Sequence, residues 1–218
     1  MEKVTYEHSL SSLEKGLTNH LTRLGESANY WLSDHPVYLS TKSSGSGEYA
    51  QVIEIAILDA DLSVLFHSQI QPTVTIDIDA EQLHGINLSS LLERPKWSEV
   101  VLQVQQLLIG RQVVVFDGLF ETRLLKQSCL AFNLPLDWLD ALTINSAMAL
   151  AVNAYGTDNR YGTVSIEYAM IKANILGFRN DNGAVAATYA LFNMLKIIAE
   201  FSGLPEPEKQ RLAYEIAV

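Results

Sequence analysis

Apolar residues recur at helical spacing in the first part of the chain. Between residues 10 and 31 they fall three or four positions apart, which places them on one face of a helix. Ser11-x-x-Glu14 has the pattern of a capping box, so the helix is expected to begin close to it, and Pro36 marks its end. Gly16 and Gly25 disfavour a coiled coil. The helix is therefore expected to pack on the domain that follows, rather than to form a dimer seam or dock a partner.

The pattern changes after residue 36 and predicts three strands within residues 37–76. The first two form a hairpin through a polar turn that contains Gly45 and Gly47. A site is expected at this turn. The acidic residues at nearby turns and strand ends are expected to be solvated rather than metal-bound. They are Asp59, Asp61, Asp77 and Asp79.

The second half of the chain predicts an α/β arrangement. A helix over residues 96–110 precedes a short, continuously apolar strand over 113–116, which is typical of a central strand buried on both faces. A helix over 120–132 follows. From Asp137 onward only helices are expected, and their ranges are 139–154, 165–176, 184–201 and 205–217.

Composition restricts the class of protein. The 218 residues, 48% hydrophobic and 18% charged, are typical of one soluble globular domain. The apolar runs are short, no signal peptide is evident, and neither a membrane span nor a membrane partner is expected. The single cysteine, Cys129, excludes an internal disulfide and is expected to be a buried thiol, with the cytoplasm as the default compartment. A net charge of −10 argues against unspecific binding of nucleic acid over a large surface, but it allows a small basic cleft.

Several segments carry distinctive patterns, namely residues 52–56, Ile70-x-Pro72, Ala80-x-x-x-His84-Gly85-Ile86, Pro95-x-Trp97-x-Glu99-Val100 and residues 147–156. Together they resemble the DEDDh 3′–5′ exonuclease family. The resemblance covers roughly residues 37–201. It implies a ribonuclease H-like mixed sheet, with three antiparallel strands and buried parallel central strands, flanked by helices. Residues 1–36 would then be a helical extension, and residues 37–218 the exonuclease-like domain.

In that family four carboxylates hold two divalent cations and a histidine is the general base. The first two carboxylates form an Asp-x-Glu pair on the first strand, where this chain has Ser40-x-Lys42. Ser43-Ser44-Gly45 then follows in place of the family's Thr-Thr-Gly. The third carboxylate closes an Asn-Ala-x-Phe-Asp motif, and here the motif reads Asp117-Gly118-Leu119-Phe120-Glu121. One carboxylate is kept there, as a glutamate.

The family's last motif is His-x-x-x-x-Asp before a helix. Alignment on Ala186-Ala187-Thr188 puts Arg179 at the histidine and Ala184 at the aspartate. No histidine follows His84 in the chain, so the resemblance implies that the general base is absent.

These residues favour an inactive exonuclease-like protein. We expect it to bind the end of a single-stranded nucleic acid, or a protein partner, in the degenerate cleft, without metal or other cofactor. Lys42 is expected to approach Glu121, its ammonium taking the place of metal charge, although a solvated lysine at a turn is an equal alternative. The cleft candidates are Ser43, Ser44, Gly45, His84, Gly85, Asp117, Phe120 and Arg123.

Two alternatives remain open from the sequence. One is a divergent nuclease that uses Mg or Mn held by Glu121 with Asp117 or Asp181; Glu54, in mid-strand, looks structural. The other is a purely structural interaction protein, with a homodimer as one form, that uses its first helix and acidic surface. Nucleic-acid binding predicts that four cations line a common cleft, namely Lys42, Arg123, Arg160 and Arg179.

Overall fold

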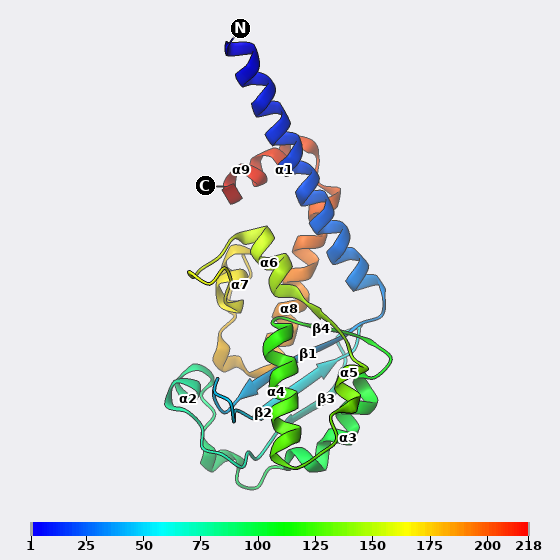
Figure 1. Cartoon of the computed structure of the whole chain (residues 1–218), viewed down its shortest axis with the longest axis vertical. Helices are drawn as coiled ribbons and strands as arrows, with labels where there is room; N and C mark the ends of the chain where they lie inside the picture. Colours follow the sequence, from blue (N-terminus) through cyan, green and yellow to red (C-terminus); the bar gives the residue numbers. More distant parts are fainter. Residues whose placement is uncertain (1, 218) are drawn as a thin grey trace.

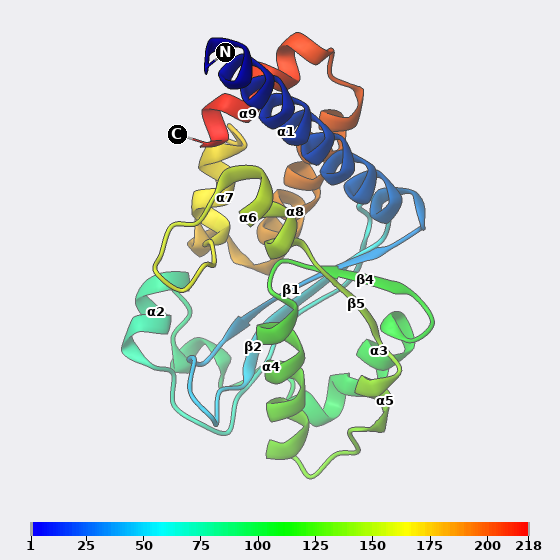
Figure 2. The same ribbon diagram turned by 45° about the horizontal axis from the view of Figure 1, so that its top comes forward.

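The computed structural model describes residues 2–217 and contains a five-stranded mixed sheet in the order β3-β2-β1-β4-β5 (Figure 1, with β5 labelled in Figure 2). β1 pairs antiparallel with β2, and β2 with β3, whereas β4 runs parallel to both β1 and β5. The strands are β1 (Val37–Ser43), β2 (Val52–Leu58), β3 (Val64–Gln69), β4 (Gln112–Val115) and β5 (Thr143–Ser146). This mixed sheet confirms the predicted fold class.

Helices cover both faces of the sheet. The α-helices are α1 (Glu2–Ser33), α2 (Ile78–His84), α3 (Trp97–Leu108), α4 (Gly118–Ala131), α5 (Asp137–Asp140), α6 (Ala147–Tyr155), α7 (Ile166–Lys172), α8 (Gly183–Glu200) and α9 (Glu206–Ala217). Three 3₁₀ turns, η1 (Leu88–Leu91), η2 (Asn180–Asn182) and η3 (Phe201–Gly203), join them.

Strand alternation divides the core into two layers. Tyr38 on β1 points into a cluster with α1, α6, α7 and α8, whereas Val37 and Leu39 point into a cluster with α3 and α4. All seven residues of β2 are buried, because both faces of that strand are covered. The two faces of β1 therefore lead to different helices, and this decides where each residue of Ser40-Thr41-Lys42 points.

The N-terminal helix packs on the rest of the protein, as predicted, and its contacts are with the C-terminal helices. Leu21, Leu24 and Ala28 are buried in the core, and the Asn29 amide donates to the Ala199 carbonyl at 3.0 Å. α1 begins at Glu2, earlier than the capping-box pattern predicted. Figure 2 shows α1 and α9 side by side at the end of the molecule away from α4.

The helical prediction for residues 139–154 is wrong in its first half. α5 ends at Asp140, and Thr143–Ser146 forms the edge strand β5, parallel to β4. β5 has four residues and only Ile144 among them is apolar, so no period of apolar positions marks it as a strand. The helix predicted over 165–176 ends at Lys172, and Asn174 then takes a left-handed conformation with φ of 56°.

Within the described residues, one helical stretch, Asn180–Gly203, is long and apolar enough to cross a membrane by length and composition. In the structure 56% of its apolar window is buried inside the protein. Its α8 residues Leu191 and Leu195 lie in the core beside β1 and β2. The sequence prediction excluded a membrane span because the uninterrupted apolar runs are short. It missed this stretch because polar residues interrupt it.

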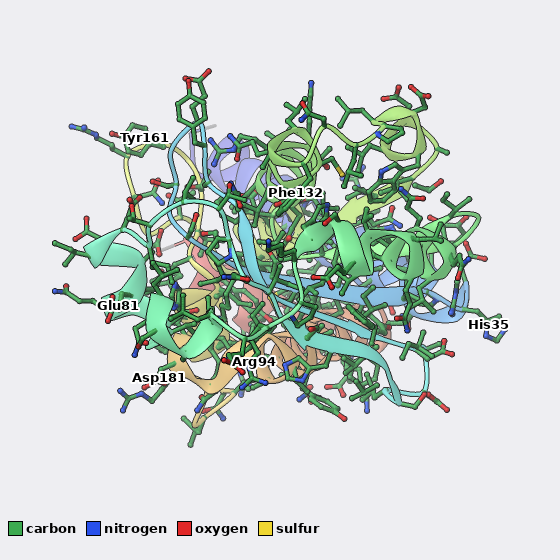
Figure 3. The ribbon with its side chains drawn as sticks, turned by 90° about the horizontal axis from the view of Figure 1, so that it is seen from below. His35, Glu81, Arg94, Phe132, Tyr161 and Asp181 are labelled. Atoms are coloured by element: carbon green, nitrogen blue, oxygen red, sulfur yellow. The ribbon has the colours of Figure 1, made fainter. Side chains whose placement is uncertain are left out.

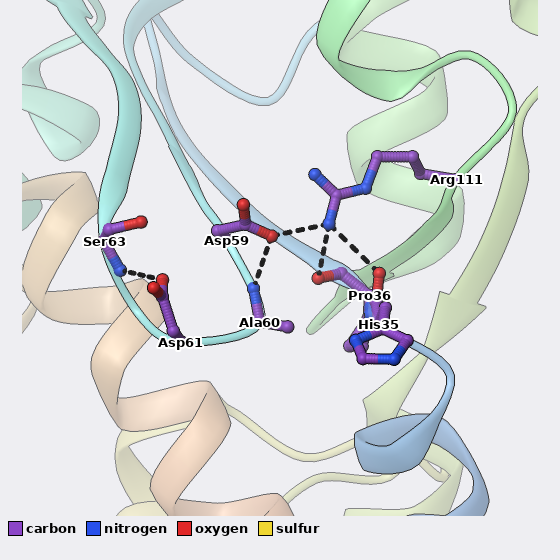
Figure 4. Close-up of polar contacts among 7 residues, drawn as sticks. All are labelled: His35, Pro36, Asp59, Ala60, Asp61, Ser63 and Arg111. Atoms are coloured by element: carbon purple, nitrogen blue, oxygen red, sulfur yellow. Dashed lines mark hydrogen bonds and ion pairs between the residues drawn. The ribbon is translucent and has the colours of Figure 1, made fainter.

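The acidic residues after β2 were expected to be simply solvated, but they make local contacts, and Asp59 forms an ion pair. The Arg111 guanidinium contacts an Asp59 oxygen at 2.6 Å and the carbonyls of His35 and Pro36 (Figure 4). This contact holds the pKa of the Asp59 carboxyl below its usual value. The Asp61 carboxylate accepts from the Ser63 amide at 2.9 Å. The start of β1 is thereby tied to the β2–β3 turn and to β4.

Cys129 is fully buried, as predicted. The Trp97 indole N–H donates to its Sγ at 3.3 Å, and burial raises the pKa of the thiol. The thiol therefore has a packing role between α3 and α4.

Candidate functional site

The candidate site lies where β1 ends, and the residues of Ser40-Thr41-Lys42 point to two sides. Thr41 faces α4, whereas Lys42 faces the α6–α8 layer. Lys42 is only 8% exposed and stands directly opposite Glu54 on β2. Lys42 is therefore a buried residue at the end of β1 and not a solvated residue of the turn.

Four acidic side chains act on the Lys42 ammonium through long-range electrostatic attraction: Glu54, Glu121, Glu167 and Asp181. Burial lowers the pKa of Lys42, and these four carboxyls oppose that shift, Glu54 most strongly. Within the described residues no carboxylate oxygen lies within 4.0 Å of its Nζ. The predicted close pair between Lys42 and Glu121 is therefore wrong.

Glu121 bonds to Thr41 instead. Its two carboxylate oxygens accept from the Thr41 hydroxyl at 2.7 Å and from the Thr41 amide at 3.3 Å. Glu121 is a fully buried α4 residue, and this burial raises its pKa to about 7. α4 lies on the face of β1 to which Thr41 points. The Glu121 side chain therefore reaches Thr41 and not the Lys42 ammonium.

Glu54 links the sheet to the first turn of α8. Its Oε2 accepts from the Ala184 amide at 3.1 Å, and its Oε1 lies 2.8 Å from His67 Nε2. Gly183 has φ of +83° and passes so close that an added Cβ would lie 3.2 Å from Glu54 Oε1. A carboxylate at a helix N-terminus is stabilised by the unpaired amides there. The expectation that Glu54 is structural is confirmed.

Two acidic metal candidates have other partners. The Asp117 side chain accepts from the Phe120 amide at 3.0 Å and caps α4. Asp181 forms an exposed ion pair with Arg179 at 3.2 Å. Figure 3 places Asp181 on the same side of the molecule as Glu81 of α2, away from His35. Among the residues whose side chains the structure describes, no group of three or more histidine, cysteine, aspartate or glutamate residues is arranged to hold a metal ion.

The turn after β1 is held by its own hydrogen bonds. The Ser44 hydroxyl accepts from the Gln51 amide at 3.0 Å, and the Ser44 carbonyl accepts from the Asp77 amide at 2.7 Å. The Asp77 carboxylate lies directly over Gly45, where a Cβ would collide with it. The turn therefore fixes the position of the segment that precedes α2.

His84 is buried as the last residue of α2, and Gly85 caps that helix with φ of 73°. The Ile86 amide donates to His84 Nδ1 at 3.1 Å, so Nε2 carries the proton and donates to the Ser43 carbonyl at 3.1 Å. Burial lowers its pKa, which favours this neutral form. His84 thus positions the β1 end and has no free ring nitrogen.

A cavity of about 720 Å³ opens beside this turn. We call it the cleft cavity. It is lined by Ser43, Gly45, Ser46, Ile76, Asp77, Ile78, Asp79, Ala80, Leu83 and Phe120. Three predicted cleft residues, Ser43, Gly45 and Phe120, therefore meet in one place.

The four cations do not meet there. Lys42 is buried, Arg179 pairs with Asp181, and Arg160 lies over the Tyr161 ring at 5.0 Å. Arg123 lies over the Phe120 ring at 5.4 Å and lines a different cavity. The prediction of one common basic cleft is wrong, and this weakens the nucleic-acid hypothesis relative to that of a purely structural interaction protein.

Sequence reasoning missed Thr41, His67 and Glu167 as residues of this region. Glu167 comes from α7 and accepts from the Asn180 amide at 3.1 Å. Only the pairing of β2 with β3 brings His67 to Glu54, so no local pattern marks either residue.

No protein-family model matches the sequence. Over 132 residues, the chain is 25% identical to an uncharacterized exonuclease, CP81, of Escherichia phage 186, and the match covers 61% of this chain and 68% of the phage protein. Exonuclease X, solved in complex with 5′ overhanging duplex DNA, matches with a TM-score of 0.54 and 18% identity over 81% of this chain and 98% of its own. The nuclease domain of 3′hExo, described as a DEDDh family member bound to rAMP, matches with a TM-score of 0.54 and 12% identity over 74% and 89%.

The structural matches show that the chain shares its fold with these solved nucleases. The sequence match adds homology to a phage protein that carries the name of an exonuclease.

Proposed function

We propose that this chain is a non-catalytic exonuclease-like protein that holds the 3′ end of a single nucleic-acid strand in its cleft without cleaving it. The observation that carries the proposal is the buried Lys42 at the end of β1, among Glu54, Glu121, Glu167 and Asp181. In the family resemblance this position belongs to a metal-binding glutamate. An ammonium in that position repels a divalent cation and balances the nearby carboxylates itself.

The remaining donor set does not fit two divalent cations. Ser40, Lys42 and Ala184 stand at three of the four carboxylate positions, and none of them offers an anionic oxygen. The fourth, Glu121, has a pKa of about 7 and already accepts two hydrogen bonds from Thr41. We therefore derive no reaction step through a metal.

The cleft cavity fits a terminal nucleoside better than a phosphate. Phe120, Ile78 and Leu83 give it an apolar wall, and an aromatic ring can stack on any base. Asp77 and Asp79 give it two carboxylates, and Asp77 makes no side-chain cap bond to α2. Carboxylates accept hydrogen bonds from hydroxyls and repel phosphate. A strand that ends in a free 3′ hydroxyl meets both requirements. Two further structural neighbours are 3′-exonucleases, which supports this polarity.

Binding to short labelled oligonucleotides tests the proposal. In EDTA, fluorescence anisotropy is expected to show binding to a single strand with a free 3′ hydroxyl, and at least about tenfold weaker binding to one with a 3′ phosphate. Phe120→Ala is expected to weaken binding about tenfold, as loss of one stacked base does. Leu102→Ala, an exposed apolar change on α3, serves as control. Equal binding of both oligonucleotides, or no binding, contradicts the proposal.

One observation favours a second candidate, a divergent metal-dependent nuclease. Glu121, Glu167 and Asp181 all lie at electrostatic range of one point, the Lys42 ammonium. These acids are not arranged as metal ligands in this structure, so a single Mg²⁺ or Mn²⁺ would require Lys42 and the carboxylates themselves to move. A nuclease assay separates this candidate from the first. A protein partner in place of nucleic acid is the outcome if neither binding nor cleavage is found.

A further inference from the structure

A second cavity lies along α4, on the other side of the β1–β2 connection from the cleft cavity. Its volume is about 550 Å³, within the range of ligand sites. We call it the α4 cavity. It is lined by Glu48, Tyr49, Gln51, Thr73, Val74, Arg123, Lys126, Gln127, Leu130 and Ala131. None of the predicted motif positions lines it, and of the cleft candidates it contains Arg123 alone.

The α4 cavity carries a local positive charge in a chain of net charge −10. Arg123 and Lys126 lie three positions apart, on one side of α4. Within the described residues neither has a carboxylate within 4.0 Å, and Glu48 is the single acidic residue in the lining. Two cations facing one anion leave an excess of one positive charge, which favours an anionic ligand.

An exposed aromatic ring stands beside these cations. Tyr49 is 76% exposed on the β1–β2 connection. The Gln127 amide fixes that connection to α4, because its Nε2 donates to the carbonyls of Gly47 and Glu48, the latter at 2.6 Å. The ring is therefore presented on an anchored segment, beside Arg123 and Lys126. An aromatic face next to two cations has the chemistry that holds a base and its phosphate.

The two cavities adjoin. Phe120 lines the cleft cavity, Arg123 lines the α4 cavity, and the Arg123 guanidinium lies 5.4 Å from the Phe120 ring. A smaller cavity of about 230 Å³ connects them around the turn, because it shares Gly45 and Asp77 with the first and Glu48, Tyr49 and Val74 with the second. The cavities are therefore neighbours along the β1–β2 connection.

We infer that the α4 cavity is a subsite for the nucleotides that precede the 3′ end, with a base stacked on Tyr49 and a backbone phosphate held by Lys126 and Arg123. This rests on the proposed function, since it extends the strand whose end the cleft cavity holds. It explains how a cleft cavity lined by Asp77 and Asp79 could belong to a nucleic-acid site, because the phosphates lie elsewhere. The ligand class is single-stranded nucleic acid of a few nucleotides.

Length-dependent binding tests the inference. A single labelled nucleotide fills only the cleft cavity, whereas a labelled hexanucleotide reaches both. For the native protein, the hexanucleotide is expected to bind at least about tenfold more tightly. Lys126→Gln is expected to reduce hexanucleotide affinity about fivefold and to lower the slope of log K against log salt by about 0.7, the value for one phosphate contact. Tyr49→Ser is expected to reduce it about tenfold. Both variants should bind the single nucleotide as the native protein does.

Two matched controls exclude a general effect of charge or aromatic loss. Lys196→Gln removes one exposed positive charge from α8, and Tyr161→Ser removes a ring that is 74% exposed. Both are expected to leave the two affinities unchanged. If the hexanucleotide binds no more tightly than the single nucleotide, or if Lys126→Gln and Tyr49→Ser behave like the controls, the subsite is wrong while the cleft proposal stands. If neither ligand binds, both proposals fail.

Discussion

Lys42 and Glu54 are direct cross-strand partners on β1 and β2, and both point into the layer that contains α8. Directly opposed residues in an antiparallel pair share a face of the sheet. Glu54 opposes the burial-induced fall of the Lys42 pKa more than any other carboxyl, and it also caps α8 through the Ala184 amide. The Glu54 carboxylate thus accepts a hydrogen bond at the N-terminus of α8 and also attracts the buried Lys42 ammonium.

This relationship predicts a favourable coupling between the two side chains. A double-mutant cycle with Lys42→Met and Glu54→Gln is expected to give about 1 kcal/mol by denaturant unfolding at pH 7. The exposed pair Arg179 and Asp181, with side chains 75% and 44% exposed, is the matched control and should give less than about 0.5 kcal/mol. A coupling no larger than that of the control pair would show that Lys42 is independent of Glu54.

Glu121 predicts a dependence of stability on pH. Its pKa is about 7 in the fold, against 4.5 for the ordinary side chain. A raised pKa means that the stabilising contribution is complete below pH 4.5 and is lost as the pH rises through 7. At 1.36 kcal/mol per pKa unit, the native protein should lose on the order of 3 kcal/mol relative to Glu121→Gln across this window.

Urea unfolding of the native protein and of Glu121→Gln at pH 5 and pH 8 measures this loss. Glutamine keeps an acceptor for the Thr41 hydroxyl but has no charge to bury. Glu81→Gln, an exposed change on α2, should show no such trend. A stability difference that stays constant between the two pH values would contradict the buried state of Glu121.

Gly183 predicts a backbone requirement at the start of α8. Its φ is +83°, and a Cβ added there would lie 3.2 Å from Glu54 Oε1, so Gly183→Ala should destabilise the protein by about 1–3 kcal/mol. Gly16→Ala is the control, since Gly16 lies within α1 with no neighbour within 4 Å. That change should stabilise by about 0.5–1 kcal/mol. Similar effects at both positions would remove the special role of Gly183.

The residue correspondence in the cleft predicts that metal binding can be restored. Ser40→Asp/Lys42→Glu/Glu121→Asp/Ala184→Asp should unfold at a lower temperature in EDTA, because four carboxylates repel one another. Excess Mn²⁺ should raise its Tm by roughly 5–10 °C, as for a ligand at 100 times its Kd. Lys42→Glu alone is the control and should respond weakly. An equal Mn²⁺ response of the native protein would contradict the correspondence.

The sequence contained enough information for the central part of the fold. The apolar run of β2 and the short apolar β4 require burial on both faces, which predicts a sheet with helices on either side. β5 was missed because its four residues at the sheet edge carry too little pattern to separate a strand from a helix.

The site was predicted less completely than the fold. Ser43, Gly45 and Phe120 belong to motifs that can be aligned with those of the exonuclease family, and this alignment predicted that they lie in one cavity. The side-chain reach of Glu121 to Thr41, rather than to Lys42, depends on which face of β1 α4 covers. The approach of Glu167 to Lys42 depends on the position of α7, and no local spacing encodes it.

Cleavage of a 5′-labelled single-stranded oligonucleotide in Mg²⁺ or Mn²⁺ tests most directly whether the protein holds a strand without cutting it. We predict that the oligonucleotide stays at full length after prolonged incubation, although it binds. Stepwise shortening from the 3′ end that is abolished by Glu121→Ala would contradict this prediction and establish a divergent nuclease.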